Sequence, residues 1–192
     1  MRPLDVVIWG WKDLGFFWGS VGHVMIAEAA TTNVLLSQFP HTVGQPSVPR
    51  GPNTLFSFSD TEAEEARPAG VVFRVTVPDE SSFDAMAANH RARPIWDWDP
   101  TPPMQTHCAR AAYDALRAGS VPIDSENRYV ITPGHTRQII PDTIWALLKS
   151  VPEVAVISQT ATELPESERV PYEADISRYV PYSSWHKQYL NK

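Results

Sequence analysis

The chain has very little cysteine: one residue, Cys108, in 192, so no internal disulfide can form. It also lacks any run of about 18 or more apolar residues, so the sequence predicts no transmembrane helix. The N-terminus shows none of the three regions of a secretory signal peptide, and we expect no such leader. Basic residues number 16 against 22 acidic ones, a balance that disfavours a nucleic-acid-binding surface.

Glycine is also scarce, with 9 residues against 18 prolines, which predicts rigid turns and extended loops between short elements. Hydrophobic residues make up 43% of the chain, enough for one sizeable core. We therefore expect a single domain over residues 1–192. Proline-containing residues 159–192 are predicted to form a C-terminal arm.

The apolar patterns predict an α+β fold. The clearest strand covers residues 71–77, which are mostly β-branched and are followed by Pro78. A hairpin is expected from strands at 21–28 and 34–39, and a further strand at 154–157. Residues 55–58 are predicted as a short strand and residues 6–9 as either a strand or a buried loop. Residues 61–70 are expected to form a loop or a frayed helix.

Three helices are predicted from their start signals. Asp79 is the N-cap of the first, which carries Phe83, Met86 and Ala87 on one face. Thr106 is the expected N-cap of the second, which has Gly119 at its C-cap. Pro141 begins the third, in which Ile144, Leu147 and Leu148 face inward.

Cys108 is the first candidate for chemistry. A thiol near a helix N-terminus lies beside unpaired N–H groups, which favour thiolate and lower the thiol pKa. The same N–H groups could stabilise the oxyanion of a tetrahedral intermediate. The alternative is that Cys108 is a small buried apolar residue, as most lone cysteines are.

His23 is the candidate base for this nucleophile. It follows Gly22 at the head of an apolar strand, and the small glycine leaves one side of its ring open. Ser37 and Gln38 lie on the returning strand, and by alternation only one of them can orient the imidazole. The alternative is a core or surface histidine with a structural role.

Other chemistry is less well supported by the sequence. No histidine and cysteine spacing typical of zinc is present, and we expect neither a metal nor a cofactor. Asp97 and Asp99 could form an acid–base pair, although their position before Pro100 is more typical of a turn. There is no serine nucleophile elbow.

Three segments in order, Gly22-His23-Val24, residues 36–40 and residues 107–116, resemble the permuted branch of the NlpC/P60 papain-like superfamily. That branch includes lecithin-retinol-acyltransferase-like enzymes and interbacterial toxin effectors. Residues 75–84 and 140–145 are similar to further segments of those effectors, and together the matches span roughly residues 9–150. Asn commonly precedes the family's cysteine, whereas this chain has His107.

The resemblance implies a permuted papain-like fold with an antiparallel sheet packed against the cysteine-bearing helix. It implies Cys108 as nucleophile, His23 as base and Ser37 as the polar third residue. We expect Trp18, Gln38 and His107 to contact substrate.

The resulting hypothesis is a cysteine peptidase or amidase, delivered as an effector toxin by a dedicated machine into a target cell, more readily its cytoplasm than its periplasm. Its substrate would be a protein or a cell-wall peptide stem, and a cognate immunity protein would be its partner. The alternatives are a lipid acyl hydrolase or acyltransferase of the same fold, with residues 16–18 as an apolar platform, and a catalytically silent adaptor or immunity module.

Overall fold

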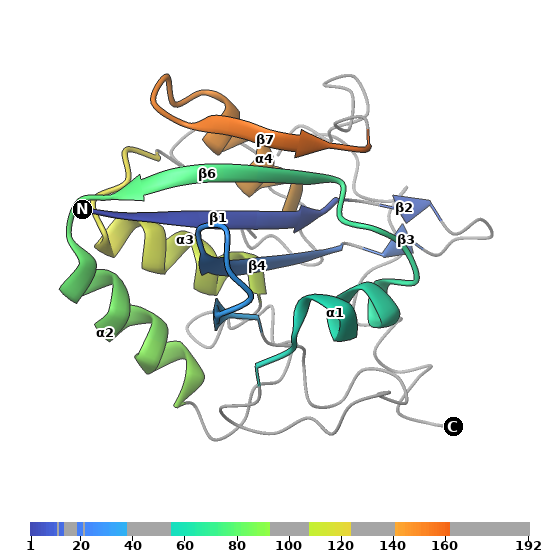
Figure 1. Cartoon of the computed structure of the whole chain (residues 1–192), viewed down its shortest axis with the longest axis horizontal. Helices are drawn as coiled ribbons and strands as arrows, with labels where there is room; N and C mark the ends of the chain where they lie inside the picture. The colour runs from blue at the N-terminus through green and yellow to red at the C-terminus, as the bar shows by residue number, and fades with distance from the viewer. Residues whose placement is uncertain are drawn as a thin grey trace, which may run out of the picture.

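The N-terminal strand β1 (Arg2–Trp9) is the central strand of a five-stranded antiparallel sheet (Figure 1). The computed structural model describes residues 1–10, 12–13, 19–20, 22–37, 55–92, 108–123 and 141–161. The sheet order is β5-β4-β1-β6-β7. The other strands of this sheet are β4 (His23–Glu28), β5 (Val34–Leu36), β6 (Val71–Val77) and β7 (Ala155–Gln159). A short ladder pairs β2 (Lys12–Asp13) with β3 (Gly19–Ser20).

Residues 6–9 thus form a strand, which settles the choice between a strand and a buried loop. Val6, Val7, Ile8 and Trp9 are all buried because β1 has strands on both edges and apolar groups on both faces. A continuous apolar run of this kind is typical of a strand that is covered on both sides. The sheet is therefore built outward from the first residues of the chain.

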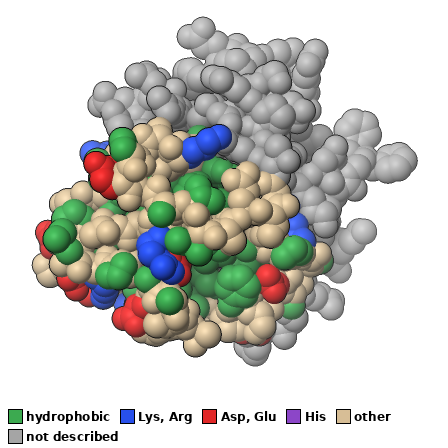
Figure 2. Space-filling model, turned by 45° about the horizontal axis from the view of Figure 1, so that its top comes forward, with side chains coloured by type: hydrophobic (Ala, Val, Ile, Leu, Met, Phe, Trp, Pro, Cys, Tyr) green, Lys and Arg blue, Asp and Glu red, His purple; other side chains and the backbone are tan. Residues whose placement is uncertain are grey.

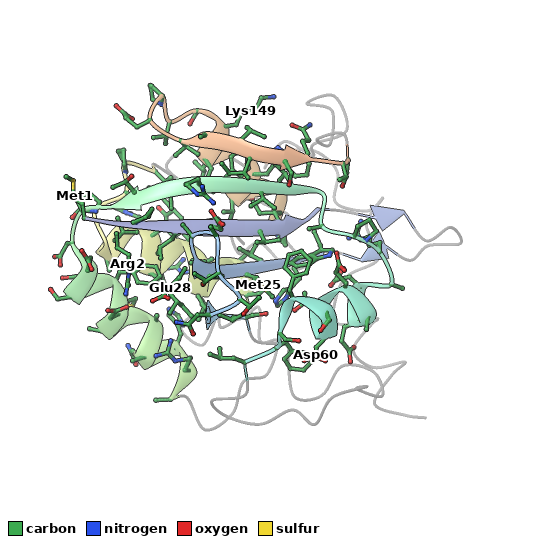
Figure 3. All side chains as sticks on the ribbon, viewed as in Figure 1. Met1, Arg2, Met25, Glu28, Asp60 and Lys149 are labelled. Atoms are coloured by element: carbon green, nitrogen blue, oxygen red, sulfur yellow. The ribbon has the colours of Figure 1, made fainter. Side chains whose placement is uncertain are left out.

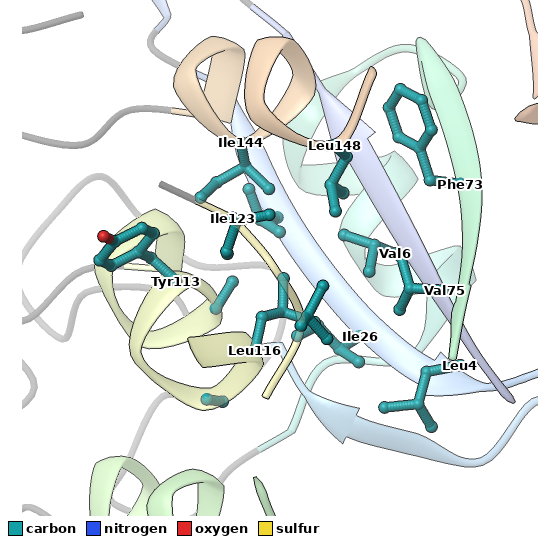
Figure 4. Packing of buried hydrophobic residues seen from close by; sticks show 14 of the residues in the cluster. Leu4, Val6, Ile26, Phe73, Val75, Tyr113, Leu116, Ile123, Ile144 and Leu148 are labelled. Carbon is teal, nitrogen blue, oxygen red and sulfur yellow. The ribbon is translucent and has the colours of Figure 1, made fainter. Parts of the chain in front are cut away.

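Four helices occur among the described residues: α1 (Phe58–Glu65), α2 (Glu80–Arg91), α3 (Cys108–Ala118) and α4 (Pro141–Lys149). The main core joins α2, α3 and α4 to one face of the sheet. Figure 4 shows Leu116 of α3 and Leu148 of α4 directed toward Val6 and Val75 of the strands. The α+β class and the packing of the sheet against the cysteine-bearing helix are as predicted.

The opposite face has a smaller cluster made of Val7, Trp9, Met25 and Ala69. Helix α1 lies at this end, where the rings of Trp9 and Phe58 are 5.6 Å apart. Figure 3 labels Met25 of this cluster, on β4, and Asp60 of α1. The two faces are therefore covered by different helices.

The predicted strand over residues 55–58 is wrong. Residues 55–57 are not in a strand, and α1 begins at Phe58 because Ser57 is its N-cap. The Ser57 hydroxyl accepts from the Asp60 backbone N–H, and the Asp60 carboxylate accepts from the Ser57 N–H, which completes a capping box. Residues 61–70 start as helix, and the helix ends at Glu65 where Ala66 adopts a left-handed φ of 52°.

The hairpin of β4 and β5 is confirmed, with shorter strands than expected. The first begins at His23, and the second ends at Leu36. The strand at 71–77 is confirmed, and the last strand covers Ala155–Gln159 where 154–157 was predicted.

Asp79 caps α2 by accepting the Ser82 N–H at 3.0 Å, as predicted. Pro141 begins α4, and Ile144, Leu147 and Leu148 are buried, again as predicted.

Gly119 directly follows the last residue of α3 and so lies at the predicted C-cap position, where its N–H donates to the Ala115 carbonyl at 2.9 Å. The left-handed residue is Ser120, with φ 64°. A Cβ on Gly119 would lie 2.6 Å from Val77 Cγ1 and 3.1 Å from Phe83 Cβ. The absence of a side chain thus lets the end of α3 approach β6 and α2 closely. This glycine is needed for packing.

Strand β7 is an edge strand on which all five residues are exposed. Val156 and Ile157 are 52% and 47% exposed. In Figure 2, turned so that the β7 side comes forward, apolar side chains reach the surface among scattered charged ones. No described helix has the length and apolar character needed to cross a bilayer.

Candidate functional site

Gly22 determines how the chain enters the strand that carries His23. Its φ is +81°, and a Cβ built on it would lie 1.8 Å from the Trp9 carbonyl oxygen. Any side chain here would both strain the backbone and collide with β1. The Gly-His pair noted in the sequence therefore has a structural cause: the glycine allows His23 to pair directly with Trp9.

His23 is buried, 1% exposed, and its Nε2 lies 3.1 Å from Ser37 Oγ. Ser37 comes directly after β5, the strand that pairs with β4. The hairpin therefore brings together two of the three predicted catalytic residues, with Ser37 as the polar partner of the imidazole. Ser37 is itself 0% exposed.

The polar contact continues into α1, which the sequence did not indicate. Ser37 Oγ lies 3.3 Å from Thr61 Oγ1, and Thr61 is also fully buried. Thr61 Oγ1 in turn donates to the Ser57 carbonyl at 2.9 Å. Four groups from β4, the end of β5, and α1 with its N-cap thus form one polar chain, in which the side chains of His23, Ser37 and Thr61 are buried. We call His23, Ser37, Thr61 and the Ser57 carbonyl the hydroxyl relay.

Trp9 forms an apolar wall beside the relay. Its ring centroid lies 6.1 Å from that of His23, tilted by 54°, and its indole N–H donates to the Arg67 carbonyl at 3.2 Å. Directly opposite residues of an antiparallel pair share a face, so the His23 ring lies on the α1 side of the sheet. The imidazole is held between an aromatic ring and a hydroxyl.

Cys108 is the first described residue of α3, so it lies at the start of the helix. It belongs to the main core together with Val24 and the alanines of the same helix. The backbone N–H of Val24 lies near enough to its sulfur to lower the thiol pKa. The sulfur therefore lies beside the residue that follows His23 on β4, on the side of the sheet that α3 covers.

The predicted low thiol pKa of Cys108 is contradicted. The residue is 6% exposed, and burial raises the pKa of the Cys108 thiol to about 12. The negative charge of Glu65 raises it further, while the N–H groups of Val24, Ala109 and Cys108 lower it. Desolvation outweighs the helix terminus because a thiolate loses most of its hydration in an apolar core. The resting group is a neutral thiol.

A second buried histidine, His90, was not singled out in the sequence. Its Nε2 lies 3.2 Å from Asp114 on α3, which also accepts from Arg110 Nε. Burial opposes the charged form of Asp114, but the hydrogen bonds and charges of His90 and Arg110 hold its pKa below the usual value. Within the described part of the chain, no group bonds the buried His90 Nδ1. This pair joins α2 to α3.

Trp18, Gln38, His107 and the predicted N-cap Thr106 lie outside the described residues, as does the arm beyond residue 161. Asp97, Asp99 and residues 16–18 also fall there. Of the two candidate partners of the imidazole, Ser37 and Gln38, the structure therefore describes only Ser37, which is hydrogen-bonded to His23. Among the described side chains, no group of three metal-ligating residues occurs.

Compared with known proteins, the chain matches no protein-family model, no curated protein and no solved structure. The geometry around His23 and Cys108 is therefore the ground for any functional proposal.

Proposed function

We propose that this protein is a cysteine hydrolase of the peptidase or amidase type, with Cys108 as nucleophile and His23 as base. One observation carries the proposal: His23 is buried, hydrogen-bonded to Ser37, and adjacent in the chain to Val24, whose N–H lies near enough to Cys108 to lower its thiol pKa. Burying an imidazole costs free energy unless its hydrogen bonds are satisfied. Buried polar groups of this kind concentrate at functional sites.

The raised thiol pKa determines the form of the mechanism. Cys108 starts as a neutral thiol on the α3 side of the sheet, so the proposal requires its proton to reach His23, whose ring lies on the α1 side, as the sulfur attacks. The S–C bond forms while the carbonyl π electrons move to oxygen, and backbone N–H groups at the start of α3 can stabilise that oxyanion. The imidazolium then protonates the leaving amine, and water hydrolyses the thioester to release the acid and restore the thiol.

The permuted papain-like topology belongs to the same proposal. The chain order, with His23 on β4 before Cys108 on α3, agrees with that topology, as does the antiparallel sheet against the cysteine helix. The further proposal is a delivered effector that acts inside a target cell and is neutralised by an immunity protein.

Growth tests this proposal. Wild type, Cys108→Ser and His23→Gln would be expressed at equal abundance in a bacterium, in the cytoplasm and with export to the periplasm. We expect arrest by wild type alone. Purified protein would then be incubated with lysate proteins, sacculi and phospholipid, each against Cys108→Ser, to identify the bond that is cut. Cleavage of phospholipid only would favour the lipid acyl hydrolase alternative.

A catalytically silent binding module is the second candidate, and the burial of Cys108 favours it. It predicts that Cys108→Ser and wild type act alike in every assay. Equal growth arrest by both, with a bound partner recovered equally by both, would replace the hydrolase proposal.

A further inference from the structure

We propose that Thr61 is a positioning residue that fixes the tautomer of His23 through Ser37, so that Nδ1 carries the lone pair and can act as base. This inference rests on the proposed function for its catalytic meaning, while the tautomer itself is a property of the folded protein. It assigns a role to α1, a helix that supplies none of the predicted catalytic residues.

The direction of the hydrogen bonds follows from counting protons. A threonine hydroxyl has one hydrogen, and Thr61 donates it to the Ser57 carbonyl at 2.9 Å. Thr61 Oγ1 can therefore only accept in its 3.3 Å contact with Ser37 Oγ. Ser37 must then donate its own single hydrogen to Thr61, which leaves its oxygen as an acceptor toward the imidazole.

The consequence for His23 is a defined proton position. Since Ser37 Oγ accepts in the 3.1 Å contact, His23 Nε2 must carry the hydrogen. A neutral imidazole has one N–H, so Nδ1 holds the lone pair. If the relay were reversed, Nε2 would accept, Nδ1 would carry the hydrogen, and that nitrogen could not take a proton from a thiol.

The relay is well suited to hold this direction because it is buried and anchored at its far end. His23, Ser37 and Thr61 are each at most 1% exposed, so bulk water has no direct access to exchange their roles. The Ser57 carbonyl also accepts the Thr61 backbone N–H at 2.9 Å in the first turn of α1. Thr61 is thus held by its own helix, and the capping box keeps that helix in place.

The experiment reads the tautomer by ¹⁵N NMR of the imidazole in full-length protein labelled at histidine, with Cys108→Ala as the background so that the thiol has no part in the result. We expect His23 to show a protonated Nε2 and an unprotonated Nδ1. Thr61→Val, which keeps the shape and removes the hydroxyl, should populate the other tautomer. Thr61→Ser should restore the original signals, whereas a merely structural role would not require the hydroxyl.

With Cys108 restored, Thr61→Val should lower the rate of substrate turnover at least about tenfold, with Thr61→Ser near wild type. An unprotonated Nε2 in the protein with native Thr61 overturns the inference without any need for Thr61→Val to fold. The same tautomer in folded Thr61→Val also overturns it. The expected tautomers together with no chemistry at Cys108 would support the relay and overturn the hydrolase, so the two failures are distinguishable.

Discussion

His90 on α2 and Asp114 on α3 are joined by a hydrogen bond of 3.2 Å between Nε2 and Oδ2, with the imidazole almost wholly buried. The two helices otherwise meet through apolar contacts in the main core. Asp114 is the only described hydrogen-bond partner of the buried imidazole, so a change to its carboxylate weakens the one polar bond that His90 makes there. The pair therefore orients α3, the helix that begins with Cys108.

Asp114→Asn should lower the free energy of unfolding by about 1–3 kcal/mol at pH 7, since hydrogen bonds to a charged group are replaced by weaker ones. The pKa of Asp114 is held low in the folded protein, so its contribution is present above its unfolded pKa. That contribution is lost as the pH falls through the folded value. Urea unfolding from pH 7 down to pH 3 would show the wild type and variant converging.

The matched control is Asp84→Asn, which removes the more exposed carboxylate that pairs with Arg2. An exposed ion pair contributes about 0–1 kcal/mol, so its effect at pH 7 should be the smaller of the two. Equal losses from both variants would show that the His90–Asp114 bond has no special part in stability.

Cys108 should resist alkylation in the folded protein. With its pKa raised to about 12 by burial, iodoacetamide at pH 8 should label it at least about tenfold more slowly than in urea-unfolded protein. Mass spectrometry of timed samples measures both rates. Labelling at the rate of the unfolded chain would mean that the sulfur is accessible and ionised more readily than this geometry allows.

The same raised pKa has a consequence for stability in base. The folded protein holds the thiol proton more tightly than the unfolded chain, whose thiol ionises near pH 8.5. The contribution of the neutral thiol to the free energy of unfolding is therefore present below that pH. It is lost as the pH rises toward the pKa of the folded protein, at up to about 1.4 kcal/mol per pH unit. Cys108→Ala should show a shallower decline between pH 8.5 and 10.5 in parallel urea titrations, because it has no thiol to ionise.

Substitutions at two adjacent residues at the end of α3 should change the free energy of unfolding in opposite directions. Gly119→Ala should destabilise the fold by about 1–3 kcal/mol, since its Cβ would press on Val77 and Phe83. Ser120→Gly should stabilise it by up to about 1 kcal/mol by relieving the positive φ. Thermal unfolding compares the two, and a gain from Gly119→Ala would contradict the packing role of that glycine.

Gly22→Ala should be more damaging than either. Its Cβ would meet the Trp9 carbonyl oxygen, a backbone atom that cannot rotate away, in a backbone conformation that alanine avoids. We expect a loss of about 2 kcal/mol or more and a changed ¹⁵N spectrum of His23, because β4 must shift against β1. An unchanged His23 signal in a stable variant would remove Gly22 from the site.

The elements with strong local signals were predictable. Asp79 and Pro141 mark helix starts that depend only on nearby backbone, and the β-branched run at 71–77 needs no distant partner to be recognised. The contact of His23 with Ser37 was also predictable, since a hairpin turn determines which residues come together. Each of these features involves residues that are close to one another in the sequence.

The remainder depends on pairings across long stretches of chain. The place of β1 beside β6 joins residues about seventy positions apart, as in Arg2 with Val77, and no local pattern encodes that pairing. The pKa of Cys108 was predicted in the wrong direction because the helix terminus is a local feature, whereas burial comes from the whole core. Thr61 was missed because it lies in a polar, acidic stretch whose inward-facing hydroxyl has no sequence signature.

The strand order also sets the sequence in which the site can assemble during synthesis. Strands β1, β4 and β5 are neighbours in the sheet and occur within the first 36 residues, so they can pair early with short loop closures. Thr61 emerges next, then β6, and α3 only later. Because domains begin to fold as the ribosome releases them, the histidine and its hydroxyl partners can be in place before the thiol arrives. Under the proposed function, a nascent chain would thus hold His23 in place before Cys108 arrives and would stay inert until α3 docks.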